Sequence, residues 1–154
     1  MSTFMDLLEQ PQAMLPGSKP QTILIIDDDE AMADVLSRRL KKQGYHAITA
    51  ESGMEGLIQA RAEHPCLVIL DLRLPDVDGF SICEQLADAS ETCMIPVIIV
   101  SGMERPDILR RCRSVGCRYF LRKPYDPDAL LILIRQAIHD AAYGGGEGEP
   151  WDHQ

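Results

Sequence analysis

The stretch ILIIDDDE, residues 23–30, joins four aliphatic side chains to four acidic ones. An apolar run of this length is typical of a buried strand. The four carboxylates repel one another. Either they form a solvated turn, or the protein requires concentrated negative charge where this strand ends.

Apolar runs of strand length recur along the chain and alternate with segments of helical periodicity. Five strands and five helices are expected, and three of the strands are nearly continuous aliphatic runs, as burial on both faces of a parallel sheet requires. This pattern predicts a doubly wound α/β domain over residues 21–142. The expected strands are TILII (22–26), HAITA (46–50), CLVIL (66–70), PVIIV (96–100) and RYFL (118–121).

Composition narrows the class of protein. A chain of 154 residues is long enough for one domain with a substantial core. Residues 1–20 are rich in Gln and Pro and are expected to form a flexible arm, and residues 143–154 a flexible Gly-rich tail. A formal net charge of -9 argues against direct nucleic-acid binding.

The cysteines and the hydropathy indicate a compartment. A zinc site formed by Cys112 and Cys117 would need a second Cys/His pair at zinc spacing, and the sequence has none. No CxxC pair occurs either. Buried free thiols and a reducing cytoplasm are therefore expected. No apolar run reaches the roughly 20 residues of a membrane span. There is no export signal, and we expect no membrane insertion.

Chemically active side chains stand where the expected strands end. Asp27 and Asp28 follow the first strand, Asp71 the third, Ser101 the fourth, and Lys123 follows the fifth. Neighbouring parallel strands lie about 4.8 Å apart, so such residues can converge. Clustered carboxylates favour a hard cation, Mg²⁺ above all. The set could transfer a phosphoryl group, with Asp71 as nucleophile and Ser101 and Lys123 holding the phosphoryl oxygens.

Each of these residues also has a purely structural interpretation. Acidic residues can cap the helix expected near Ala31, and Asp29 is the best candidate for that cap. Asp71 alone could be a loop residue and Lys123 a surface lysine. These interpretations are weaker together than singly, because they must hold at four strand ends at once.

Four motifs resemble the receiver domains of bacterial two-component response regulators. ILIIDDDE is similar to the family's strand and acidic pair, DLRLPDVDG to the segment around its phosphoacceptor, VIIVSG to the strand ending in a hydroxyl residue, and FLRKP to its lysine–proline element. The resemblance covers residues 21–142. It implies a (βα)5 flavodoxin-like three-layer sandwich whose parallel sheet has the strand order 2-1-3-4-5.

The resemblance also implies a metal site. Asp71 would be the phosphoacceptor, and Asp27, Asp28, Asp71 and the backbone carbonyl of Arg73 would hold Mg²⁺, with Mn²⁺ as a substitute. Asp28 would contact the ion directly and Asp27 mainly through water. No other cofactor is expected.

A conformational switch is implied as well. Ser101 and Lys123 would hold the phosphoryl group, and the bond between Lys123 and Pro124 would be cis. Ser101 would couple to Phe120, changing the face of the fourth helix, fifth strand and fifth helix. Gly102 stands where many family members have Ala, which would open the site to water or the phosphodonor.

The expected function is therefore a phosphorylation-activated signalling switch that catalyses only its own phosphorylation and dephosphorylation. Its partners would be a sensor histidine kinase or a histidine phosphotransfer protein, and an unknown downstream protein. The chain would be a monomer or a phosphorylation-dependent dimer. Whether it is a complete single-domain regulator or part of a longer protein stays open.

Three alternatives to this function are disfavoured by the residues present. A phosphatase of the haloacid dehalogenase class needs a second Asp two residues after the nucleophile, where this chain has Arg73. A flavin-binding protein needs a Ser/Thr/Gly-rich loop after the first strand, where this chain has carboxylates. A degenerate receiver lacks an acidic or lysine residue of the site, and none is missing.

Overall fold

The computed structural model describes residues 20–144, and the expected arm and tail lie almost entirely outside them. Strands and helices alternate throughout this part of the chain, as the sequence predicts. The elements are β1 (Thr22–Ile26), α2 (Glu30–Lys42), β2 (His46–Ala50), α3 (Gly53–Glu63), β3 (Leu67–Asp71), α4 (Gly79–Asp88), β4 (Val97–Ser101), α5 (Ile108–Ser114), β5 (Tyr119–Arg122) and α6 (Pro127–Ala142).

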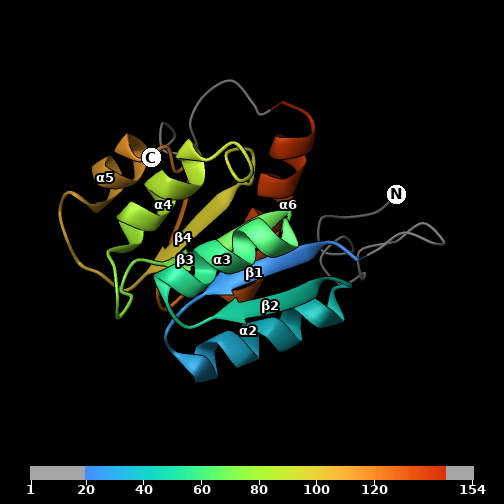
Figure 1. Ribbon diagram of the computed structural model, residues 1–154. Coiled ribbons are helices and arrows are strands. Elements are labelled where there is room, and N and C mark those ends of the chain that lie inside the picture. Colours follow the sequence, from blue (N-terminus) through green and yellow to red (C-terminus); the bar gives the residue numbers. More distant parts are fainter. Residues whose placement is uncertain (1–19, 145–154) are drawn as a thin grey trace.

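The five strands form one parallel sheet in the order β2-β1-β3-β4-β5 (Figure 1). The chain passes from β1 outward to the edge strand β2 and then back past β1 to β3, which is the middle strand. The expected doubly wound fold and strand order are thus confirmed. The reversal between β1 and β3 is where such sheets open a crevice at their carboxyl ends.

Helices cover both faces of the sheet and make three layers. Ile23 and Ile25 of β1 pack in a core with α2 and α6, whereas Leu24 and Ile26 pack in a second core with α3, α4 and α5. All five residues of β3 and of β4 are buried. The continuous aliphatic runs therefore reflect burial on both faces.

Three strands differ slightly from the sequence prediction. β3, β4 and β5 each begin and end one residue later than expected. Asp71 pairs with Val100, and Ser101 with Arg122, in the ladders of the sheet. These polar residues are therefore the last members of their strands, because backbone pairing continues beyond the aliphatic run.

Side-chain caps define where the helices begin. The carboxylate of Asp29 accepts a hydrogen bond from the backbone N–H of Met32 at 3.1 Å, which confirms the predicted cap of α2. Asp78 caps α4 and Asp126 caps α6 in the same way. At the other end of α6, Tyr143 is the C-cap and Gly144 has a φ of 83°. This left-handed conformation suits glycine and ends the helix.

The five cysteines are all free, and Cys112 and Cys117 are buried as predicted.

None of the helices between residues 20 and 144 combines the length and apolar character needed to cross a membrane.

Candidate functional site

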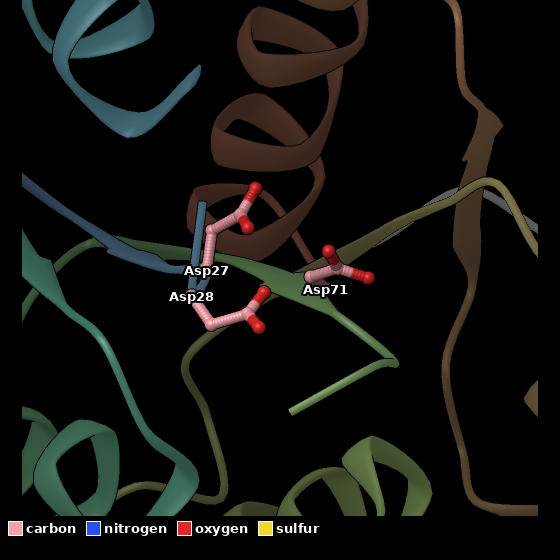
Figure 2. A group of neighbouring side chains, drawn as sticks. All are labelled: Asp27, Asp28 and Asp71. Carbon is pink, nitrogen blue, oxygen red and sulfur yellow. The ribbon is translucent and has the colours of Figure 1, made fainter. Parts of the chain in front are cut away.

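Three carboxylates meet beyond the ends of the central strands (Figure 2). Asp27 and Asp28 follow β1, and Asp71 ends the adjacent β3. One ligand oxygen from each lies within 4.8 Å of the others. Asp27 and Asp71 expose only 6% and 7% of their surface, whereas Asp28 is exposed. The expected acidic cluster therefore exists, with two buried members and one open to solvent.

Lys123 joins the two buried carboxylates. Its Nζ lies 3.0 Å from Oδ2 of Asp27 and 3.1 Å from Oδ2 of Asp71. The residue follows β5, its N–H donates to the carbonyl of Ser101 at 2.9 Å, and its bond to Pro124 is cis as predicted. The side chain thus reaches across β4 to the acidic cluster.

Burial controls the electrostatics of this cluster. The pKa of Asp71 is raised mainly by its removal from water, against the opposing effects of the Arg73 N–H and the Lys123 ammonium. Burial lowers the pKa of Lys123, but its contacts with Asp27 and Asp71 outweigh this and raise it overall. Burial is therefore the dominant influence on the pKa of Asp71, and the Lys123 ammonium offsets only part of it.

Backbone N–H groups hold the buried carboxylates in place. The N–H of Asp29 donates to Oδ1 of Asp27 at 2.9 Å, and that of Arg73 donates to Oδ1 of Asp71 at 3.1 Å. The turn after Asp71 closes through a bridge between Arg73 and Asp78. A Cβ on Gly79 would lie 2.5 Å from the Cα of Leu72, so only glycine fits there.

Ser101 and Phe120 occupy the β4–β5 side of the site. Ser101 is fully buried, and its Oγ accepts a hydrogen bond from the N–H of Met103 at 3.1 Å. Phe120 is half-buried on β5 opposite Ile99, packed against the core on the α3, α4 and α5 face. Their predicted coupling stays a prediction, as does the use of the Arg73 carbonyl as a ligand.

One residue near the site was missed by sequence reasoning. The carboxylate of Asp76 accepts hydrogen bonds from the N–H groups of Gly53 and Met54, both at 2.9 Å, so the loop after Asp71 caps α3. These two bonds lower the pKa of Asp76. In the sequence Asp76 is only one acidic residue of the PDVDG turn, and its partners lie 23 and 22 residues away.

The donor set fits a hard divalent cation. All three converging side chains offer carboxylate oxygens, the ligands that Mg²⁺ prefers. Asp71 is buried and burial raises its pKa, so a cation beside it would stabilise its charged form. Asp28 is open to solvent and can take an ion from solution, while Asp27 and Asp71 lie on the buried side of the acidic cluster.

Comparisons with known proteins identify the family. Residues 23–135 match the model of the response regulator receiver domain. The chain therefore belongs to the receiver domains of response regulators, the two-component signalling family. It is a signalling module rather than a classical enzyme.

Two curated relatives differ in length. The chain is 31% identical over 121 residues to the polar-differentiation response regulator DivK of Brucella ovis, covering 79% of this chain and 98% of DivK. It is 32% identical over 124 residues to the probable transcriptional regulator ycf27 of Porphyra purpurea, covering 80% of this chain. The chain spans about half, 50%, of the length of that second relative.

Solved structures agree on the fold. A CheY-like receiver domain protein from Methanospirillum hungatei has a TM-score of 0.77 at 27% identity, covering 82% of this chain and all of its own. A putative response regulator from Chloroflexus aurantiacus has a TM-score of 0.74 at 29% identity, covering 79% of this chain and 99% of its own.

Proposed function

We propose that this chain is a phosphorylation-activated signalling switch in which Asp71 accepts a phosphoryl group. The observation that supports this most strongly is the position of Lys123, whose Nζ contacts two buried carboxylates from different strands. In the resting site the ammonium neutralises part of the charge of Asp27 and Asp71. When a phosphoryl group arrives, the same ammonium is available to its oxygens.

In the proposed transfer an oxygen of Asp71 attacks phosphorus and forms an acyl phosphate. The bond from phosphorus to the donor breaks, and this donor is the imidazole nitrogen of a phosphohistidine or the acetate of acetyl phosphate. The Arg73 N–H keeps the second carboxylate oxygen in place at 3.1 Å. Lys123 neutralises one phosphoryl oxygen, and the hydroxyl of Ser101 donates to another.

Asp27, Asp28, Asp71 and the carbonyl of Arg73 are the proposed ligands of Mg²⁺, for which Mn²⁺ can substitute. A bound Mg²⁺ would supply positive charge to the transferring oxygens. Without it, an incoming phosphate meets three carboxylates and one ammonium, which is a net repulsive site. Phosphorylation is therefore expected to require the metal.

The output step that we propose is a change in the face made by α5, β5 and α6. Ser101 would move toward the phosphoryl group, and Phe120 would turn inward into the space next to it. The phosphoryl group adds nearly two negative charges. Its interactions differ in free energy between the two conformations, and this difference shifts the equilibrium between them. Phe120 is half-buried on β5 in this structure.

The proposed partners are a sensor histidine kinase or a histidine phosphotransfer protein in the cytoplasm, and a downstream protein that binds the altered face. The chain would be a monomer or a phosphorylation-dependent dimer. We propose that residues 21–142 form the complete switch. Output through a further domain and output through protein contacts alone are both compatible with it, since the matched segment is 50% of the ycf27 relative and 98% of DivK.

Intact mass spectrometry tests this function directly. The protein is incubated with acetyl phosphate, with Mg²⁺ or with a chelator, beside the Asp71→Asn variant. The parent is expected to gain one phosphoryl group only with Mg²⁺, and the variant none. An unmodified parent would contradict the proposal, and so would equal labelling of Asp71→Asn.

A further inference from the structure

A pocket of about 340 Å³ lies at the opposite end of the strands from the acidic cluster. Its walls come from α4, the starts of β4 and β5, the loops before them, and α6. The lining is mostly apolar, with side chains such as Leu86 and Ile95. Three of the five cysteines, Cys83, Cys93 and Cys117, also line it. The phosphoryl site uses none of these residues.

Two of these thiols are buried and adjacent. Cys83 and Cys117 expose 3% and 4% of their surface, and their thiols are close enough to shift one another's pKa. Cys83 Sγ lies 3.9 Å from the carbonyl oxygen of Val115, and Cys117 Sγ lies 3.0 Å from that of Tyr119. Cys83 therefore lies against Val115, in the segment that leads through Cys117 into β5.

The pair is chemically asymmetric. Interaction with the Cys117 thiol lowers the pKa of the Cys83 thiol. The same interaction, together with burial, raises the pKa of Cys117. Burial raises the pKa of nearby Cys112 to about 12. Because the thiolate is the nucleophile, the lowered pKa favours Cys83 over Cys112 and Cys117 as the first of the three thiols to react.

We propose that Cys83 is oxidised by small hydroperoxides entering this pocket, and that Cys117 then closes a disulfide with it. A small neutral oxidant suits the site because the lining is mostly apolar and both sulfurs are buried. The proposal goes beyond the phosphoryl switch and does not depend on it. The disulfide would tie α4 to the segment that precedes β5.

Both chemical steps balance. The Cys83 sulfur attacks one peroxide oxygen, an S–O bond forms as the O–O bond breaks, and the departing alkoxide takes the thiol proton and leaves as an alcohol. The Cys117 sulfur then attacks Sγ of Cys83. An S–S bond forms, the S–O bond breaks, and the hydroxyl leaves as water with the Cys117 proton. The thiols are oxidised, and the hydroperoxide is reduced to alcohol and water.

The test uses the full chain, fully reduced and then treated with tert-butyl hydroperoxide without phosphodonor. We expect the intact mass to fall by two hydrogens, and peptide mapping without reductant to find Cys83 joined to Cys117. The Cys66→Ser/Cys93→Ser double variant should give the same result, because Cys66 lies in the other core and Cys93 is exposed. In the Cys117→Ser variant, dimedone should instead capture a sulfenic acid on Cys83.

Several results would overturn the proposal. These are an unchanged mass in the parent, a bond from Cys83 to Cys112, and products that contain only Cys93-linked dimers. Oxidation by glutathione disulfide at the same rate would overturn the choice of a small neutral oxidant, because that molecule is larger and charged. Mapping of the parent chain needs no substitution, so the test stands even where a serine variant fails to fold.

Discussion

The two ends of the sheet carry two different kinds of reactive groups. At the carboxyl end, Asp27, Asp71 and Lys123 come from strand ends and are held by backbone pairing and by one another. At the amino end of β4 and β5, Cys83 comes from a helix and Cys117 from a loop. Charged groups at the first end require compensation, whereas neutral thiols at the second are tolerated in an apolar pocket. The first region should therefore respond to charge and metal, and the second to oxidants.

The largest expected effect lies at the exposed member of the acidic cluster. Asp28→Asn should abolish Mg²⁺-dependent phosphorylation, because it removes a carboxylate whose oxygen lies within 4.8 Å of those of Asp27 and Asp71. The affinity for Mg²⁺ should fall by about tenfold or more. Loss of a residue that only hydrogen-bonds to a metal ligand already lowers metal affinity by about tenfold. Calorimetric titration with Mg²⁺ and the acetyl phosphate assay measure both effects.

Glu30→Gln is the matched control for that change. Glu30 begins α2, two residues further along the acidic run, and does not belong to the carboxylate cluster. Its neutralisation should barely change phosphorylation. An equal loss in both variants would show that general negative charge, and not the geometry of the cluster, governs the site.

Removal of the ammonium should weaken the fold itself. Lys123→Met leaves Asp27 and Asp71 buried without their shared partner, and we expect the free energy of unfolding to fall by about 1–3 kcal/mol. Mg²⁺ should restore part of the loss, because it supplies positive charge to the same oxygens. Urea unfolding with and without Mg²⁺ measures this, with the exposed Lys42→Met as control. A loss that Mg²⁺ deepens would contradict this account.

The pH dependence of stability should reflect Asp71. Its pKa is raised in the fold, mainly by burial, so its contribution to stability is complete below the unfolded pKa of about 4 and is lost as pH rises through the folded pKa. Asp71→Asn resembles the protonated form. Without divalent cations the variant should therefore become more stable relative to the parent as pH rises from acid to neutral. A difference that shrinks toward neutral pH would contradict the assignment.

Two glycines, one in each region, should give the smallest effects, with opposite signs. At Gly102 a Cβ would meet only the Lys123 Cβ, at 3.8 Å, so Gly102→Ala should stabilise the chain by about 0.4–1 kcal/mol. At Gly116, beside the thiol pocket, φ is +84°, so Gly116→Ala should destabilise it by about 1–2 kcal/mol.

Thermal unfolding compares the two variants. Gly102→Ala should also slow the loss of the phosphoryl group, because the added methyl group narrows the approach of water to the site. Faster dephosphorylation of this variant would contradict the open-site interpretation of Gly102.

Sequence reasoning predicted the alternation of elements and the convergence of strand ends, and it erred by one residue at three strands. Aliphatic runs such as VIIV reveal buried strands, but pairing carries Ser101 into the ladder beyond the last aliphatic residue. Periodicity follows hydrophobicity, whereas a strand ends where its hydrogen bonds end. The cap at Asp29 was predictable because its partner Met32 is only three residues away.

The alternation of strands and helices along the chain, and the polar residues that end the strands, were determined by the sequence alone, because hydrophobic periodicity is a local pattern. Tertiary structure decided which distant side chains meet. Lys123 reaches Asp27 across 96 residues and Asp71 across 52, and Asp76 caps α3 across 23. Likewise, no cysteine spacing indicates that Cys83 and Cys117 are neighbours. Such contacts depend on how helices and loops pack on the sheet, and that packing is a property of the whole fold.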